Sequence, residues 1–394
     1  MLKIFFGVNE SGVAYWRGKL PGLKLQEKGL ADVRMFSVYD TRPSDCDGML
    51  KDSDLVYCPS PCGVEAVAEY IKYYQLGKGT VADYDDNLFD CHPFNPGYST
   101  LGLNEVKINI PNDDGTERSE WLWADHDDIH TPGFDLKDNR ARFASHIDVI
   151  NVSTLITTTT PHLQNILADQ GNRNQDEIHI IPNSIDFNLY RPFIKRKRPR
   201  NKIRIGWTAS DSHLLEGQLL IKILTELYSR RQDFEFVIMG NIDKFRSAAK
   251  KFPIEFHEFV DIRIYPLKLA SLELDIGICP LADYSFNHSK SALKWTEYSA
   301  LKIPAVCSDL PPYQVITNGT DGMLAKDHIA FVDRLEELMD NESLRHSVAQ
   351  AAYEHNYEKY NLDTNVNLWL EMFERAQMRT DRELTYKGSL IPKI

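Results

Sequence analysis

Three charged side chains in the segment FNHSKSALKWTEYSALKIP (286–304) have a spacing that suits a phosphorylated ligand. If Lys290 is position i, then Lys294 is i+4 and Glu297 is i+7, and this spacing places all three residues on one stripe of a helix. A helix that begins near Ser289 would present free backbone N–H groups and two lysine charges to a diphosphate. Glu297, about 10 Å further along the axis, could accept hydrogen bonds from a vicinal diol such as a ribose. The same spacing also fits ordinary ion pairs on a wet helix surface.

A second group of acidic residues follows an apolar run in the first half of the chain. The segment GTVADYDD places Asp83, Asp85 and Asp86 at the carboxyl end of an expected strand, where open parallel sheets bind their ligands. We expect one or two of these carboxylates to contact ligand hydroxyl groups. Two other interpretations stay open, namely an Asp-x-Asp site for a divalent ion and simple capping of the loop.

Aromatic and polar residues after two other expected strands are further candidates. Tyr15, Trp16 and Arg17 follow the loop NESG on the first turn of an expected helix, and they could stack on a sugar or a base. Core packing explains the two aromatic residues equally well. His213, in GWTASDSH, either contacts the ligand or caps its own helix, and Asn183, in IPNSID, either shapes a turn or contacts the ligand.

These candidates belong to a repeating pattern of short apolar runs and helix-like segments. The alternation predicts a mostly parallel sheet with helices on both faces, and it restarts after residue 202. We therefore predict an α/β protein with two Rossmann-like, doubly wound units that face one another across a ligand-binding cleft. Helices are expected at 214–229 and from about 242. The expected strands are LKIFFGV, ADVRMFSVY, SDLVYCPS, GTVADYD and STLITTTT in the first unit, and KIRIGW, FEFVIMG, IEFHEFV, LDIGICPL and PAVCS in the second.

A change of composition at KRKRPRNK marks the expected boundary between the two domains, because Pro and like charges discourage regular structure. The final helix has an apolar face that needs a partner, either on the second domain or, if it crosses back, on the first. This face consists of Val366, Trp369, Leu370, Phe373 and Ala376. The predicted parts are a first domain (1–190) with an inserted hairpin and loops at about 104–140, a basic linker (191–202), a second domain (203–364), and a final helix with its tail (365–394).

Length and composition restrict the class of protein. A chain of 394 residues with 42% apolar residues is long enough for two cores. No apolar run approaches the roughly 18–20 residues that span a bilayer, and the amino terminus is too polar for a secretion signal, so we expect a cytoplasmic protein. The net charge of −12 argues against a surface that binds nucleic acid throughout, although KRKRPRNK is one local basic cluster. The six cysteines fit free thiols better than a zinc site.

The segment DIGICPLADYSFNHSKSALKWTEYSALKIPAVCSDLPPYQVITNGTDGMLA resembles the donor-binding signature of GT-B glycosyltransferases of the retaining family 4 type. IHIIPNSIDFNLYRP is similar to the motif that enters the hinge in that family, and KIRIGWTASDSH to the start of its donor domain. Weaker similarities lie at GVNESGVAYWRGKLPG and VADYDDNLF. The likeness spans most of residues 1–375 and is densest from 178 to 325.

This resemblance implies the GT-B fold and the metal-independent transfer of a sugar, with retention, from a nucleotide-diphosphate donor such as a UDP-sugar. No further cofactor is expected. Glu297 would hold the donor ribose, and Gly12 and Gly240 would let the backbone approach the donor. The expected catalytic residues are Lys290, Asp85 and Asp86. The other expected contacts are Ser289, Ser291, Lys294, Thr208, Ser210 and His213 with the donor, and Tyr15, Trp16, Arg17 and Asp83 with the acceptor.

Two positions depart from the family pattern. The second glutamate of that pattern, eight residues before Glu297, is Ser289 in this chain. The usual Arg and Lys pair after the first strand of the donor domain is also absent, because GWTASDSH contains neither residue. We expect Lys290 and Lys294 to supply the missing positive charge, which leaves the identity of the donor sugar open.

Several acceptors fit the sequence. A glycan or a small molecule is one class, and a hydroxymethylated base in DNA is another, because the insert DDGTERSEWLWADHDD resembles phage-type enzymes that would act in the host cytoplasm. A function of a different class is a non-catalytic sugar-binding or nucleotide-binding protein that closes like a clamshell. The oligomeric state stays open.

Overall fold

The computed structural model describes residues 1–8, 12–37, 46–112, 115–126, 129–194, 201–210, 213–240 and 251–393. The chain forms two compact units, one of Met1–Ile181 with Leu368–Ile394 and the other of Pro182–Asn367. Each unit is an α/β structure around a six-stranded parallel sheet, so the predicted fold class is confirmed. How the units face one another stays a prediction. The helix expected from about 242 and most of KRKRPRNK lie outside the described residues.

The sheet of unit 1 has the strand order β10-β9-β4-β3-β1-β2. Successive strands are added on opposite sides of β1, so the order reverses between β1 and β3, and ligands of such sheets bind at this switch point. All five runs expected in this unit are strands, whereas the three-residue strand β10 was not expected. The strands are β1 (Lys3–Val8), β2 (Asp32–Ser37), β3 (Leu55–Pro59), β4 (Gly79–Tyr84), β9 (Leu155–Thr158) and β10 (Ile178–Ile180).

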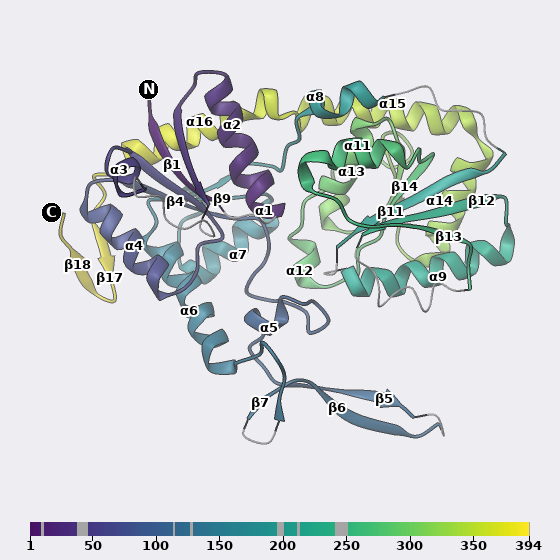
Figure 1. Ribbon diagram of the computed structural model, residues 1–394, viewed down its shortest axis with the longest axis horizontal. Coiled ribbons are helices and arrows are strands. Elements are labelled where there is room, and N and C mark those ends of the chain that lie inside the picture. Colours follow the sequence, from purple (N-terminus) through teal and green to yellow (C-terminus); the bar gives the residue numbers. More distant parts are fainter. Residues whose placement is uncertain are drawn as a thin grey trace. The chain divides into compact units, whose positions relative to one another are not determined.

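Helices cover both faces of this sheet (Figure 1). On one face, Val67, Val149 and Leu163 from α4, α6 and α7 pack in the same cluster as Val56 and Ile156 of the strands. On the other face lie α2 and the end of α16 (Leu362–Met378). The further helices are α1 (Gly12–Ala14), a π-helical turn (Tyr15–Lys19), α2 (Leu20–Glu27), α3 (Cys46–Lys51), α4 (Val64–Gln75), α5 (Tyr98–Leu101), α6 (Leu136–Val152) and α7 (Pro161–Gly171).

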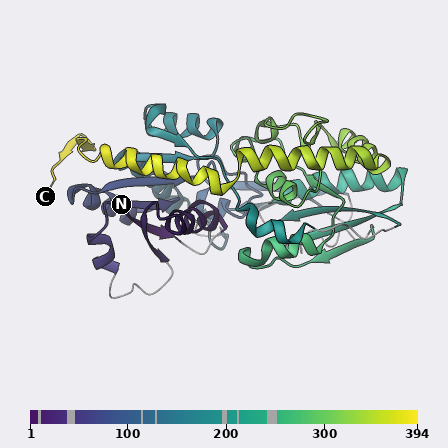
Figure 2. The ribbon, with the colours of Figure 1, turned by 90° about the horizontal axis from the view of Figure 1, so that it is seen from above.

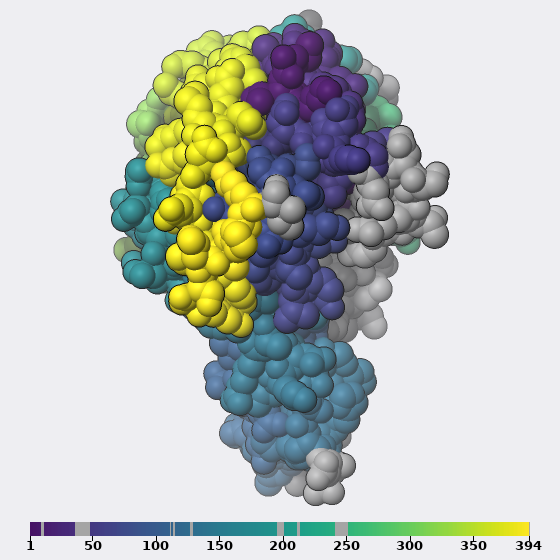
Figure 3. Space-filling view, turned by 90° about the vertical axis from the view of Figure 1, so that its left-hand side faces the viewer, coloured from purple at the N-terminus to yellow at the C-terminus, as the bar shows by residue number. Residues whose placement is uncertain are grey.

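The C-terminal segment packs on unit 1 through aromatic side chains and hydrogen bonds. Trp369 and Phe373 of α16 lie with their ring centres 5.5 and 5.6 Å from that of Tyr57 on β3. Figure 2 shows α16 from above, and Figure 3 shows the yellow tail beside α4. There the Tyr74 hydroxyl donates to the Arg382 carbonyl (2.8 Å) and accepts from the Leu384 amide (2.9 Å). Of the predicted face of α16, Leu370 is only half-buried. The tail forms the hairpin β17 (Leu384–Tyr386) and β18 (Ser389–Ile391).

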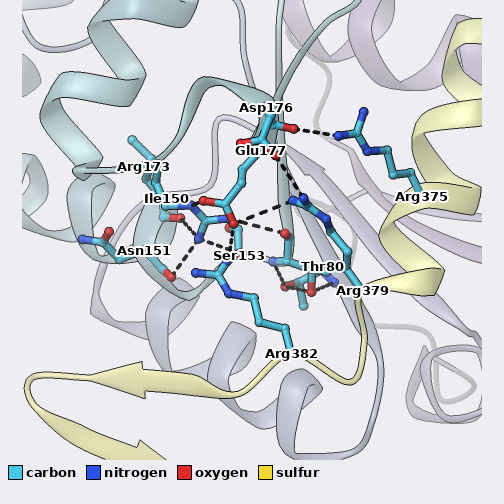
Figure 4. Close-up of polar contacts among 11 residues, drawn as sticks. Thr80, Ile150, Asn151, Ser153, Arg173, Asp176, Glu177, Arg375, Arg379 and Arg382 are labelled. Atoms are coloured by element: carbon cyan, nitrogen blue, oxygen red, sulfur yellow. Dashed lines mark hydrogen bonds and ion pairs between the residues drawn. The ribbon is translucent and has the colours of Figure 1, made fainter.

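Arginines join this segment to the end of α6 (Figure 4). Arg173 is buried and donates to the carbonyls of Ile150, Asn151 and Ser153 at 3.1–3.3 Å, which satisfies the last turn of α6. Its Nε lies 3.1 Å from the Glu177 carboxylate. The same carboxylate pairs with Arg382 (2.7 Å) and lies 3.7 Å from Arg379, while Arg375 donates to the Asp176 carbonyl (3.1 Å).

A β-hairpin projects from unit 1 within the range 104–140, where the sequence predicted an inserted hairpin (Figure 1). At its base, Tyr98 and Phe134 are stacked with ring centres 6.1 Å apart in a small separate core. Lys107 covers the Trp121 ring at 4.1 Å on the hairpin itself. The strands are β5 (Val106–Pro111), β6 (Glu117–Trp123), β7 (Asp125–His126) and β8 (Ile129–His130).

The sheet of unit 2 has the strand order β13-β12-β11-β14-β15-β16. This is the strand order of dinucleotide-binding folds, and its switch point lies between β11 and β14. All five expected runs are strands, and the three-residue strand β16 was not expected. The strands are β11 (Ile203–Ala209), β12 (Phe234–Gly240), β13 (Ile254–His257), β14 (Ile276–Cys279), β15 (Ala305–Ser308) and β16 (Met323–Ala325).

Helices of unit 2 bury apolar faces on this sheet. Leu220, Leu224 and Leu227 of α9 and Phe331 and Leu335 of α14 belong to the same core cluster as the central strands. No helix of the described residues is long and apolar enough to cross a membrane. The helices are α8 (Phe187–Tyr190), α9 (Leu214–Arg230), α11 (Tyr265–Ser271), α12 (Ser285–His288), α13 (Leu293–Ala300), α14 (His328–Asp340), α15 (Glu342–Lys359) and the start of α16.

Candidate functional site

The candidate site of unit 2 lies where β11 and β14 end at the switch point of the sheet. The segment after β11 contains Ser210 and His213, and the segment after β14 leads through α12 to Lys290 and Lys294. These two strands pair in parallel, with Gly206 opposite Gly277, so their carboxyl ends lie at the same edge. The topology therefore brings together residues that are about 80 positions apart in the sequence.

Gly240 closes the neighbouring strand at the same edge, opposite Ala209. Its φ of +147° lies outside the range that L-residues favour, and a Cβ atom there would stand 1.7 Å from the Ala209 carbonyl oxygen. Only glycine fits this position. At Gly12, in contrast, a Cβ atom would meet nothing within 4 Å, so the described structure gives no steric reason for that glycine.

The single helix expected from Ser289 is wrong. The chain forms the short helix α12 up to His288 and then a turn, and α13 begins only at Leu293. Lys290 thus precedes the helix, whereas Lys294 and Glu297 lie on it. Between the two helices, Ser289 is fully buried and its hydroxyl donates to the Ser285 carbonyl (3.4 Å). A bond from a serine hydroxyl to the carbonyl four residues earlier slightly destabilises a helix and often bends it.

Lys290 lies in this turn, and Lys294 lies on the first turn of α13. The Lys290 ammonium lies 5.2 Å from the centre of the Phe286 ring, and the Lys294 ammonium lies 6.0 Å from that of Trp207. Burial lowers the pKa of Lys294, and repulsion by Lys290 lowers it further. Ser291 accepts a hydrogen bond from the Asn183 amide (2.9 Å), so this asparagine holds the turn. Two positive charges this close together favour an anionic ligand.

Glu216 compensates part of this positive charge and was not predicted from the sequence. Its carboxylate accepts from the Asn287 amide (2.5 Å) and the Ala282 N–H (3.2 Å), and lies 3.5 Å from His213. Burial opposes ionisation, but His213 and Lys290 together hold the pKa of Glu216 at about 2. Burial and the two lysines lower the pKa of His213 to about 3, so its imidazole is neutral at pH 7. His213 begins α9 without a side-chain capping bond.

Glu297 is buried, with 7% of its surface exposed, and its carboxylate accepts a hydrogen bond from Tyr265 (3.1 Å). The Tyr265 hydroxyl also lies 3.3 Å from Thr208 Oγ1 on β11. Burial raises the pKa of Glu297 to about 7, although Tyr265 and Lys294 counteract the increase. Tyr265 was not predicted, because only the fold brings α11 next to α13.

In unit 1, Arg17 and Asp83 are partners of one another. Arg17 Nη2 and Asp83 Oδ1 are 2.6 Å apart, and the two side chains are 1% and 0% exposed. Arg17 also donates to the Ile181 carbonyl (2.6 Å) and lies 4.7 Å above the Trp369 ring, while Thr157 donates to Asp83 (2.5 Å). This burial argues against the direct acceptor contact expected for Arg17 and Asp83, and favours a role in fixing the end of β4.

The other unit 1 candidates lie nearer the surface. Asp85 and Asp86 follow β4 and are half-buried, as are Tyr15 and Trp16, whose rings meet edge to face at 5.3 Å. Burial, followed by repulsion from Asp86 and Asp83, raises the pKa of Asp85 well above its usual range. A carboxyl pKa raised by burial and by neighbouring carboxylates is a feature that catalytic residues often share.

Among the described residues, no group of three or more His, Cys, Asp or Glu side chains is arranged to hold a metal ion. Five cysteines of the described part are free thiols, namely Cys58, Cys62, Cys91, Cys279 and Cys307.

Part of the chain matches a known protein family. Residues 206–341, which begin within β11 and contain β12 to β16 and the candidate residues of unit 2, match the model of the family described as glycosyl transferases group 1. No curated protein matches the chain by sequence.

Solved structures resemble the chain over nearly its whole length. A glycosyltransferase from Rickettsia africae ESF-5 gives a TM-score of 0.63 at 12% identity, over 95% of this chain and 98% of that one. Anabaena Alr3699/HepE in complex with UDP gives 0.60 at 12% identity, over 95% and 100%. Sucrose-phosphate synthase from Thermosynechococcus elongatus gives 0.60 at 9% identity, over 94% and 98%. At these identities the likeness concerns the fold alone.

Proposed function

Since the chain has the GT-B fold expected from its sequence and carries a glycosyl transferases group 1 domain at residues 206–341, we propose that it transfers a sugar from a nucleotide-diphosphate donor to an acceptor hydroxyl. Unit 2 binds the donor and unit 1 binds the acceptor. We assign the protein to the cytoplasm, as its sequence led us to expect.

One observation supports this proposal above the others, namely the grouping of complementary side chains at the switch point of unit 2. Lys290 and Lys294 offer positive charge to a diphosphate, and Glu297, one turn into α13, offers acceptor oxygens to a ribose. Gly240, at a φ that only glycine tolerates, lets the ends of β11 and β12 meet at this edge of the sheet, where we propose that the base binds. Diphosphate and ribose thus have one matching group of side chains each, which an ordinary surface ion-pair cluster would not require.

UDP is the nucleotide that we assign to the donor. Anabaena Alr3699/HepE, which shares the fold, has been solved in complex with UDP and in complex with UDP-glucose. Thr208, Ser210 and His213 are further donor contacts on the β11 side. The neutral imidazole of His213 can donate one hydrogen bond to a phosphate or sugar oxygen without adding charge.

The proposed reaction retains the anomeric configuration and needs no metal. As the bond between the anomeric carbon and the phosphate oxygen breaks, negative charge grows on the diphosphate, and Lys290 and Lys294 stabilise it. The acceptor oxygen forms its bond on the same face of the sugar, and its proton passes to the departing phosphate oxygen. Asp85 and Asp86 are proposed to orient the acceptor hydroxyl, with Tyr15 and Trp16 packing against the acceptor.

The acceptor is proposed to be a glycan or a small molecule, with a hydroxymethylated base in DNA as a second candidate. The chain's acidic charge of −12 favours the first class. Titration with duplex DNA at 50 and 200 mM salt separates the two. A DNA acceptor requires affinity that falls by orders of magnitude between these conditions, because counterions are released on binding. If the acceptor is a glycan, the protein should show no measurable binding to DNA.

The test of the donor proposal is a titration and turnover assay with UDP-glucose and other nucleotide sugars. Wild-type protein should bind one of them and release UDP on adding acceptors. Glu297→Ala should weaken donor binding or turnover by at least about tenfold, because a buried hydrogen-bonded carboxylate is lost. Glu258→Ala, at an exposed position of the same unit, is the matched control. Tight binding of a free sugar without transfer from any nucleotide sugar would instead support a non-catalytic binding protein.

A further inference from the structure

Glu297 is held by hydroxyl groups from two other elements. Tyr265, the first residue of α11, places its Oη 3.1 Å from Glu297 Oε2 and 3.3 Å from Thr208 Oγ1. A phenol has one proton, so when it donates to the carboxylate, the threonine hydroxyl must donate to the phenol oxygen. The hydrogen bonds then run from Thr208 on β11 through Tyr265 to Glu297 on α13. All three side chains are at least nine-tenths buried.

The start of this chain of hydrogen bonds is fixed by a second tyrosine. The Thr208 amide donates to Tyr298 Oη (3.2 Å), and the Tyr298 hydroxyl donates to the Gly206 carbonyl (3.3 Å). Tyr298 is fully buried on α13, one residue after Glu297. The end of β11 and the second half of α13 are therefore tied together, and Tyr265 has a defined position between them.

Tyr265 uses only part of the acceptor capacity of Glu297. A carboxylate has about four lone-pair sites, and among the described residues the Tyr265 hydroxyl is the single hydrogen-bond donor to this one. Oε1 and the second site of Oε2 are left for the two hydroxyl groups of a diol. The fixed phenol thus determines in which direction the remaining acceptor sites point.

Resting on the nucleotide-sugar donor proposed above, we propose that Tyr265 is a positioning residue that keeps Glu297 ionised and directed at the donor ribose. The phenol contacts no substrate and acts through Glu297. It thereby makes donor binding depend on the ribose hydroxyls and on pH in the neutral range.

The pH dependence has a defined sign. Burial raises the pKa of Glu297 to about 7, and the Tyr265 hydrogen bond and Lys294 lower it. The ionised carboxylate accepts hydrogen bonds from two hydroxyl groups more strongly than the protonated acid, in which one oxygen carries a proton, so donor affinity should increase as pH rises through 7. Without the phenol hydroxyl the pKa rises further, and binding needs a higher pH. The titratable groups around this carboxylate are Tyr265 on α11, Lys294 and Tyr298 on α13, Tyr190 on α8 beyond Tyr265, and Lys290, Glu216 and Cys279 beyond Lys294.

The experiment is calorimetric titration of UDP-glucose between pH 6 and 8.5. Both phosphates of this ligand are esterified, so its own charge is constant in this window. Wild-type affinity should rise about tenfold between pH 6 and 8. Tyr265→Phe should bind about fivefold more weakly at pH 7 and within about twofold of wild type at pH 8.5. Tyr228→Phe, at the far end of α9 where the ring packs on Phe252, is the matched control and should follow wild type.

A second readout compares UDP with 2′-deoxy-UDP. Wild type should prefer UDP by about tenfold at pH 7, since one hydroxyl to a buried carboxylate is lost in the analogue. Tyr265→Phe should lose most of this preference at pH 7 and regain it at pH 8.5. If Tyr265→Phe does not fold, Thr208→Val removes the hydroxyl behind the phenol and should shift the profile in the same direction.

The outcomes separate this inference from the proposed function. A wild-type pH profile in Tyr265→Phe, or an equal loss at every pH, would overturn the positioning role while donor binding stands. If wild-type protein binds neither UDP-glucose nor UDP at any pH, the donor proposal itself is overturned, and the role of Tyr265 with it.

Discussion

At the scale of residues, the site combines groups whose charge states are set by burial and by one another. Lys290 and Lys294 repel each other, Glu216 offsets them, and His213 stays neutral because protonation would add a third positive charge. Glu297 accepts a hydrogen bond from Tyr265 and interacts electrostatically with Lys294. In our proposal, Lys290 and Lys294 form the anion-binding part of the site, and Glu297 forms the hydroxyl-binding part.

The anion-binding part can be tested separately from the hydroxyl-binding part. Replacing Lys290 by Gln removes a charge that we propose faces the diphosphate but leaves Glu297 and its partners in place. We expect the affinity for UDP to fall about tenfold, while that for uridine changes less than about twofold, because charge-assisted hydrogen bonds to phosphate are lost. Calorimetry with both ligands measures this. Lys326→Gln, an exposed lysine of the same unit, is the control, and an equal loss for uridine would contradict the assignment.

Gly240 is a residue for which we predict a large effect on stability. An alanine Cβ atom at this position would stand 1.7 Å from the Ala209 carbonyl oxygen, so the ends of β11 and β12 would have to separate. We expect Gly240→Ala to cost roughly 2 kcal/mol or more, seen as a lower melting temperature. Gly12→Ala has open space and should melt like wild type. Equal melting of both variants would show that the strand ends adapt.

At the scale of elements, the Glu177 carboxylate links the segment that follows α16 to the end of α6. Glu177 Oε1 lies 2.7 Å from Arg382, Oε2 lies 3.1 Å from Arg173, and Arg173 in turn caps α6. An electrostatic partner shared by several cations is more costly to remove than a surface ion pair, because the guanidinium groups are left uncompensated.

The prediction at this scale is that Glu177→Gln destabilises the protein. Urea denaturation should show a loss of about 2–4 kcal/mol, somewhat below the roughly 3–5 kcal/mol for a fully buried ion pair, because the Arg382 side chain is 40% exposed. Glu371→Gln makes the same chemical change at an exposed position of α16 and should be neutral within about 0.5 kcal/mol. A neutral Glu177→Gln would mean that the arginines find other partners without cost.

The helices and strands also show which parts of the fold can be predicted from the sequence alone. All ten apolar runs are strands, because buried parallel strands have continuous apolar sequences. The short strands β10 and β16 have too few residues for a pattern. The division of 286–304 into α12 and α13 was missed, since an i, i+4, i+7 spacing of charged residues does not reveal at which residue a helix begins.

At the scale of the whole molecule, candidate residues lie near the switch point of each of the two parallel sheets. In unit 2 these are the segments after β11 and β14, and in unit 1 the segment after β1 carries Tyr15 and Trp16. The order of apolar runs and helix-like segments along the chain was sufficient to predict the fold and the places of these segments after the strands. It was not sufficient to predict Tyr265 and Glu216, whose roles depend on α11 and α9 lying next to α13 and α12, nor the burial of the Arg17–Asp83 pair.

The most direct test of the central claim is a crystal structure of the protein with UDP bound. The account predicts that the diphosphate lies within hydrogen-bonding distance of Lys290 and of the first backbone amides of α13, with the ribose hydroxyls on Glu297. Electron density for UDP elsewhere on the molecule, or a ribose that faces away from Glu297, would contradict it.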